Sequence, residues 1–252
     1  MANAATIALS LATFMNVLDT SIGNVFPLSQ TLPLWLQQHM GYTATWAGLA
    51  TAPVGLLAIV LSPWVGKNVS RIDLRKLATV AFLGFADVLW MRSHFNTQAD
   101  FMTILIPTLL QGAAMAFFFI PLQAIVFSGL SPQQTPSAAG LSNFVRITAG
   151  AVGTSLFTPV WENRASLHHA QLVESIHTGN ATAMATLDQL MGSGMNREQA
   201  LATIDRTNNQ QAYTLAVTDI FYLSAVLFFV LVAVIWLTKP TTGAAVDAGG
   251  AH

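Results

Sequence analysis

Long apolar runs, separated by short polar breaks, dominate this sequence of 252 residues. A helix of about 20 mostly apolar residues can cross a bilayer core about 30 Å thick. Runs of this kind occupy residues 4–25, 46–65, 77–91, 102–127, 138–160 and 216–237. The pattern therefore predicts an all-α fold, a polytopic membrane helix bundle with about six transmembrane helices.

The composition agrees with this pattern. Hydrophobic residues make up 53% of the chain and charged residues only 8%, against about 25% charged residues in an average soluble domain. The net charge of −1 gives no basic field for nucleic acid, and the lack of cysteine excludes disulfides and thiolate metal sites. The sequence also lacks a Gly-x-x-x-x-Gly-Lys phosphate loop and a nucleophile–base arrangement. We therefore expect neither an enzyme nor an ATP-driven pump, and no cofactor or metal.

The distribution of basic residues predicts the orientation of the chain in the membrane. The short loop at residues 66–76 carries Lys67, Arg71, Arg75 and Lys76, four of the ten basic residues. Short loops rich in lysine and arginine stay in the cytoplasm. Both termini are therefore expected to be cytoplasmic, with the first, third and fifth spans running outward.

A long polar segment at residues 161–213 is then expected outside the membrane. We expect helical pieces that lie over the outer face, with Asn196 capping a helix at residues 198–208 and the glycines Gly192 and Gly194 breaking the helix before it. The predicted organisation is a transmembrane bundle over residues 1–240, which includes this periplasmic segment, and a disordered cytoplasmic tail over residues 241–252.

Ionisable residues inside membrane spans are costly and are candidates for function. Asp19, late in the first span, could exchange protons because a low dielectric raises the pKa of a carboxyl group, or it could only orient helices. Arg146 in the fifth span could be a cation in a central cavity, with Asn143 one turn away on the same face. It could also extend to the cytoplasmic interface.

Other polar residues in the spans fit packing roles as well as ligand binding. Gln111 and Gln123 in the fourth span could contact a substrate or form hydrogen bonds between helices. Asp87 and Asp219 lie near the outer ends of their spans, where interfacial carboxylates are ordinary. The pair His168–His169 is a weak metal signal, because adjacent side chains on a helix diverge by about 100°.

Several blocks of the sequence resemble the EmrB-type multidrug exporters, proton-coupled antiporters of the major facilitator superfamily with fourteen helices. The first block is residues 6–25, with the triplet Leu18-Asp19-Thr20. The others are residues 41–55, the loop residues Gly66, Lys67, Asp73, Arg75 and Lys76, residues 141–154 and residues 161–172.

The resemblance implies proton-driven export of hydrophobic drug-like substrates from the bacterial inner membrane, together with a periplasmic adaptor and an outer-membrane channel. It implies that Asp19 carries the proton and that Gly66, Lys67, Asp73 and Arg75 form the inner-loop motif that locks neighbouring helices. Asn143, Arg146, Gln111 and Gln123 are then the candidates for the substrate cavity.

Members of that family have about twice this length. The resemblance implies that the first helix is joined near residues 25–26 to the outer part of the ninth helix, without helices two to eight. Three interpretations follow: an exporter, a non-transporting membrane remnant or scaffold that binds the adaptor, and a homodimer that rebuilds a transporter of two halves.

Overall fold

The computed structural model describes residues 31–127, 133, 135–174, 176 and 180–236, and its regular elements in these residues are helices. Residues 31–38 are helical. The elements that follow are α2 (Ala44–Thr51), α3 (Val54–Asn68), α4 (Leu74–Arg92), α5 (Phe101–Phe127), α6 (Thr135–Glu174), α7 (Ala181–Gly192) and α8 (Arg197–Ile235). The predicted all-α fold class is confirmed.

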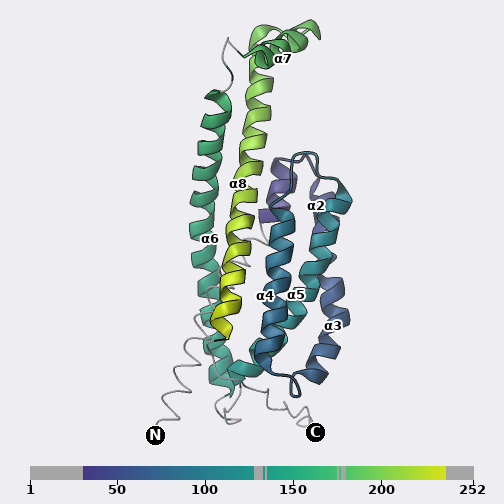
Figure 1. Cartoon of the computed structure of the whole chain (residues 1–252), viewed down its shortest axis with the longest axis vertical. Coiled ribbons are helices and arrows are strands. Elements are labelled where there is room, and N and C mark those ends of the chain that lie inside the picture. The colour runs from purple at the N-terminus through teal and green to yellow at the C-terminus, as the bar shows by residue number, and fades with distance from the viewer. Residues whose placement is uncertain (1–30, 128–132, 134, 175, 177–179, 237–252) are drawn as a thin grey trace.

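The helices form a bundle with α4 near its centre. α4 packs against α5 on one side and against α8 on the other, α3 covers the far side of α5, and α6 covers the far side of α8 (Figure 1). Residues 31–38 join this bundle through Trp35, which is fully buried and donates from its indole nitrogen to the hydroxyl of Thr214 on α8 at 3.2 Å. The first described helix and the last therefore pack together.

Aromatic side chains fill the contact between α4, α5 and α8. Phe85 of α4 stacks on Phe228 of α8 with ring centroids 5.3 Å apart, and its edge meets Phe118 of α5 at 5.7 Å. Phe82, one turn away on α4, lies 5.9 Å from Phe228 and 6.0 Å from Phe118. All four rings are at most 4% exposed, so these three helices share one apolar core.

The contact between α3 and α5 depends on a glycine. A Cβ atom added to Gly112 of α5 would overlap the carbonyl oxygen of Val54 and would lie 3.0 Å from its carbonyl carbon. Val54 begins α3, so the backbones of the two helices meet at this point. Small residues allow membrane helices to approach this closely.

The polar segment at residues 161–213 differs from the expected helical pieces lying over one end of the bundle. Most of it continues α6 and α8, which have 40 and 39 residues and are therefore about 60 Å long. Both helices project well beyond the shorter helices, and α7 caps their far end (Figure 1). A polar stretch without glycine or proline can continue a helix into water, as it does in both α6 and α8.

The predicted local signals in this segment are confirmed. α7 ends at Gly192, and Gly194 adopts a positive φ of 98° in the turn that follows. Asn196 caps α8: its side chain accepts from the Gln199 amide at 2.8 Å, and the Gln199 side chain accepts from the Asn196 amide at 3.0 Å. The helix expected at residues 198–208 is the first part of α8.

Three helical stretches are long and apolar enough to cross a membrane: Ala44–Asn68, Phe101–Pro121 and Arg197–Ile235. They overlap three of the six predicted spans, at residues 46–65, 102–127 and 216–237. The predicted spans at residues 77–91 and 138–160 lie in α4 and α6. Within the described residues, these two helices are not among the stretches that are long and apolar enough to cross a membrane. α4 carries Arg75, Lys76, Asp87 and Arg92 within 19 residues, and α6 continues into polar sequence.

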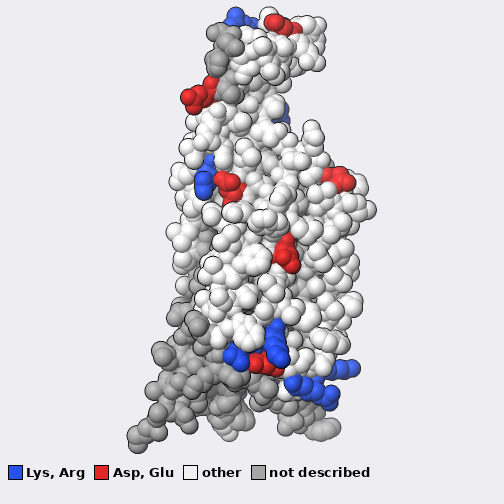
Figure 2. Space-filling view, in the orientation of Figure 1, with Lys and Arg blue, Asp and Glu red and all other residues white. Residues whose placement is uncertain are grey.

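The surface is consistent with a bilayer around the middle of the bundle. On the face shown in Figure 2, basic side chains gather at the end where α3 leads into α4, and charges are sparse over the broad middle. Large apolar side chains are exposed on α3 and along α6. On α6 they are Leu141, Phe144, Ile147, Val152, Leu156, Val160, Leu167 and Val173. Such a surface needs lipid or another protein surface to cover it.

Three predictions fall outside the described residues. They are the first span at residues 4–25, its Asp19, and the tail at residues 241–252.

Candidate functional site

The residues predicted to form the inner-loop motif lie at the basic end of the bundle. Gly66 and Lys67 lie in the last turn of α3, and Asp73 caps the start of α4. The Asp73 carboxylate accepts from the Arg75 amide at 3.0 Å and pairs with the Arg75 guanidinium at 3.1 Å. Asp73 and Arg75 of the predicted motif are therefore in direct contact.

This junction also contacts the end of α8. The Arg75 guanidinium lies over the ring of Trp236, 5.2 Å from its centroid, and the Trp236 indole donates to the hydroxyl of Thr79 on α4 at 3.1 Å. Cations bind to the negative faces of aromatic rings. Arg75 thus links the loop between α3 and α4 to the last turn of the chain that the structure describes.

The electrostatics of the junction favour the ionised form of Asp73. Partial burial raises the pKa of its carboxyl group, but the hydrogen bonds from Arg75 and the charges of Arg75 and Lys76 outweigh this effect. The net result is a pKa below the ordinary value of 3.8. Asp73 therefore carries its charge at neutral pH and holds Arg75 in place.

A second polar contact lies inside the bundle and was not predicted from the sequence. Arg92, the last residue of α4, is only 1% exposed, and its guanidinium donates to the Gln111 side chain of α5 at 2.7 Å and to Thr108 at 3.4 Å. The ring of Phe221 from α8 lies 6.0 Å from the guanidinium, and the Arg92 Nε atom has no hydrogen-bond partner among the described residues.

The four predicted cavity residues are placed on two helices. Gln111 of α5 is 7% exposed and bonded to Arg92, which fits the interpretation as a hydrogen bond between helices. Asn143 lies exposed on α6. Gln123 and Arg146 belong to α5 and α6, but their side chains are outside the described part of the structure. A role for these residues in substrate binding stays a prediction.

The two remaining carboxylates in predicted spans have different surroundings. Asp87 is exposed on α4. Asp219 of α8 accepts from His168 at 2.8 Å and lies 3.6 Å from the Arg164 guanidinium, both on α6. His169 faces Asp205 instead, at 3.2 Å. The two histidines thus hold α6 against α8 through separate carboxylates, and the described residues contain no cluster of three potential metal ligands.

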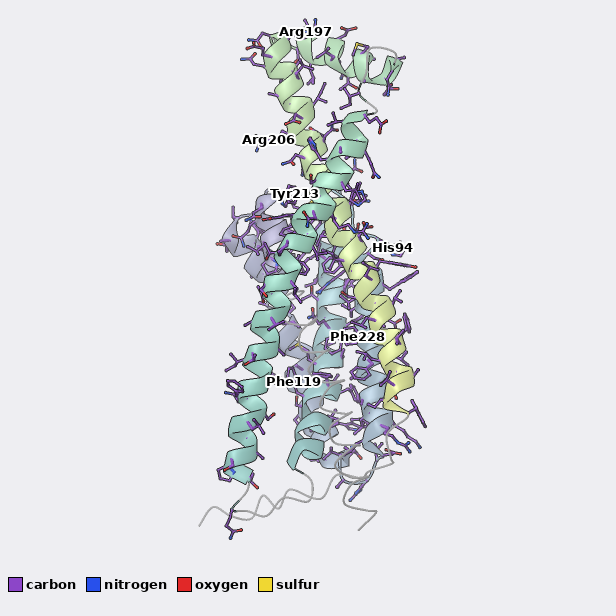
Figure 3. All side chains as sticks on the ribbon, turned by 90° about the vertical axis from the view of Figure 1, so that its left-hand side faces the viewer. His94, Phe119, Arg197, Arg206, Tyr213 and Phe228 are labelled. Carbon is purple, nitrogen blue, oxygen red and sulfur yellow. The ribbon has the colours of Figure 1, made fainter. Side chains whose placement is uncertain are left out.

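A cavity of about 440 Å³ lies between residues 31–39, α6 and α8. Tyr213 lines it, and Figure 3 places this residue at the level where the shorter helices end, with Arg206 and Arg197 farther out along α8. The described lining is mostly aromatic and uncharged polar: Thr31, Leu34, Gln38, His39, Thr154, Phe157, Thr158, Trp161, Glu162, Asn209 and Tyr213. None of the four predicted cavity residues is among them.

Comparison with known proteins places these features in a family. The family described as Major Facilitator Superfamily matches residues 2–154. The multidrug export protein EmrB of Escherichia coli (strain K12) is 44% identical over 222 residues, which cover 88% of this chain and 43% of that protein. The fatty acid resistance protein FarB of Neisseria gonorrhoeae is 39% identical over 221 residues, with the same coverage of 88% and 43%. The chain therefore spans less than half the length of these relatives.

Proposed function

Because this chain belongs to the major facilitator superfamily of membrane transporters, we propose that it takes part in proton-coupled export of hydrophobic drugs across the bacterial inner membrane. The chain is a multi-pass membrane protein of a transporter family, not an enzyme. The observation that carries the proposal is the 44% identity with a multidrug export protein over 88% of the chain.

In this proposal Asp19 carries the proton. A carboxylate within a membrane span is costly when charged, so it can bind and release a proton as its surroundings change. Asn143, Arg146, Gln111 and Gln123 would supply polar contacts to the substrate. The inner-loop motif would hold the cytoplasmic ends of the helices together through the contact between Asp73 and Arg75.

The charge distribution supports a defined orientation. The basic loop between α3 and α4 would face the cytoplasm, as short loops rich in lysine and arginine do, and both termini would lie on that side. The projecting parts of α6 and α8, with α7 at their end, would then extend into the periplasm, at the opposite end of the molecule (Figure 1).

The periplasmic adaptor would bind this projection, with the outer-membrane channel beyond it. Replacing residues 161–213 with a short linker should abolish binding of purified adaptor. Equal binding after the replacement would show that the contact lies elsewhere.

A second candidate is a non-transporting scaffold that binds the adaptor. Transporter sites form between two repeats that move against each other, and the matched part of the exporter is 43% of its length, so adaptor binding without transport by these residues alone is the alternative to test. A homodimer would supply two halves and restore transport. Crosslinking in native membranes distinguishes these cases, since a strictly monomeric population excludes the homodimer.

Efflux of a fluorescent dye from cells that express only this chain tests the proposal. We expect efflux that stops with a protonophore and in Asp19→Asn, but continues in Asp188→Asn, which removes an exposed carboxylate of α7. If chain that is inserted and folded gives no efflux, the exporter interpretation is wrong for this chain alone and the scaffold is favoured.

A further inference from the structure

The cavity between residues 31–39, α6 and α8 has the volume of a small-molecule site. Its volume of about 440 Å³ falls within the range of about 300–1,000 Å³ that is usual for ligand pockets. It is built from segments far apart in sequence, and the Gln210 side chain of α8 donates to the His39 carbonyl and ties two of them together.

One wall of the cavity is a fixed aromatic corner. His39 stacks on Tyr213 with centroids 4.4 Å apart and an angle of 18°, and the Trp161 ring is nearly perpendicular to both, at 5.9 Å and 5.6 Å. The Trp161 indole donates to the Tyr213 carbonyl at 3.3 Å, and Phe157 lies 6.1 Å from Trp161. These contacts join all three segments, so the rings are in place before a ligand arrives.

The described lining of the cavity carries a negative charge. Glu162 is the one acidic side chain among these described residues, which include no lysine or arginine. Burial lowers the pKa of the His39 imidazole below its ordinary 6.5, so the ring is neutral at pH 7. Arg164, two residues from Glu162, pairs with Asp219 at 3.6 Å.

Aromatic faces and a carboxylate together select one ligand chemistry. Both attract cations, and the rings also bind flat apolar groups. An anion would meet the Glu162 charge without a basic side chain from the described lining to offset it.

We propose that this cavity binds a lipophilic aromatic cation, with Glu162 facing its charge and the corner of His39, Trp161 and Tyr213 contacting its rings. The site is separate from Gln111, Gln123, Asn143 and Arg146, to which the proposed export assigns the drug. Its occupancy requires neither transport nor proton coupling, so it goes beyond the proposed function.

Binding of two ions of the same shape and opposite charge to the purified chain tests the proposal. Tetraphenylphosphonium and tetraphenylborate are titrated at pH 7 by isothermal calorimetry, in an uncharged detergent. We expect the cation to bind at least about tenfold more tightly than the anion, a difference of about 1.4 kcal/mol. Equal affinity for the two ions would overturn the proposal, because it would indicate partition into the apolar surface.

Variants of exposed carboxylates on α6 locate the site. Glu162→Gln keeps the shape of the side chain and should weaken cation binding about fivefold to tenfold, and Glu162→Lys should reverse the preference towards the anion. Glu174→Gln, at the far end of the same helix, should change neither affinity. Cation binding that is unchanged in both Glu162 variants would place the cation elsewhere and refute this site.

Discussion

At the scale of single residues, a few charged side chains are held by specific partners. Asp73 and Arg75 join the start of α4 to the end of α8, and Arg92 joins α4 to α5 through Gln111. The first pair is predictable from the inner-loop motif. The second is not, because the spacing of Arg92 and Gln111 in the sequence carries no signal that the two helices meet there.

The Asp73 contact makes stability depend on pH. Since the pKa of Asp73 in the folded chain lies below its ordinary value of 3.8, the stabilisation is present above pH 3.8 and is lost as the pH falls through the lower, folded-state value. An ion pair of this kind contributes about 0.2–1 kcal/mol. Asp73→Asn keeps a capping side chain and should lose the ion pair, so its melting temperature should fall less on acidification than that of the wild type.

Asp73→Ala provides the control for this prediction. This variant removes the cap as well as the ion pair. It should therefore lower the free energy of unfolding at pH 7 by about 1 kcal/mol more than Asp73→Asn does. Identical acid sensitivity of the wild type and Asp73→Asn would contradict the assignment of the pH dependence to this contact.

Because the guanidinium of Arg92 is buried, removing its partner alone should destabilise the chain more than removing both residues of the contact. Gln111→Leu leaves a buried charge without its closest acceptor and should cost about 1–3 kcal/mol of unfolding free energy. The double variant Arg92→Met with Gln111→Leu removes both polar partners and should be more stable than Gln111→Leu alone. Thermal unfolding in detergent measures the order, and a double variant that is less stable than Gln111→Leu would contradict it.

At the scale of elements, the apolar runs predicted most helices but not their lengths. Four predicted spans coincide with helices, because burial and lipid exposure both need an apolar helix. The span at 46–65 lies in α2 and α3, 77–91 in α4, 102–127 in α5, and 216–237 largely in α8. Residues 161–213 are predicted as helical pieces over the outer face, but most of this segment continues α6 and α8. Residues 197–235 contain neither glycine nor proline, and that signal predicts the continuous α8.

Contacts between elements depend on long-range packing that a sequence pattern does not contain. The cavity combines residues 31–39 with parts of α6 and α8, which are more than 100 residues away along the chain. Trp161, Glu162 and Tyr213 were expected in a polar outer segment, but no local signal shows that His39 packs against them.

The close approach at Gly112 gives a prediction for the packing of α3 against α5. Gly112→Ala should force the two helices apart, because its Cβ atom meets the backbone of Val54 and not a flexible side chain. The cost should be at least about 1–3 kcal/mol, the usual range for overpacking. Gly55→Ala places the same methyl group in open space on α3 and should leave the melting temperature nearly unchanged. Equal effects of the two variants would show that the helices do not meet at Gly112.

At the scale of the whole molecule, the described chain combines a membrane bundle with a long two-helix projection. The family supplies the transporter interpretation, and the coverage of 43% of the exporter makes the capacity of this chain for transport the central question. The exposed apolar surfaces of α3 and α6 need lipid or a second protein surface. A second copy would provide such a surface and a second half.

Transport by the purified chain in liposomes tests the central claim most directly. The chain is reconstituted with an imposed pH gradient, and movement of a hydrophobic fluorescent drug is followed together with the internal pH. The account predicts drug movement against proton movement, which collapses when a protonophore dissipates the gradient and is lost in Asp19→Asn but not in Asp188→Asn. Correctly folded protein that moves neither drug nor protons, or that moves drug equally well without a gradient, would contradict it.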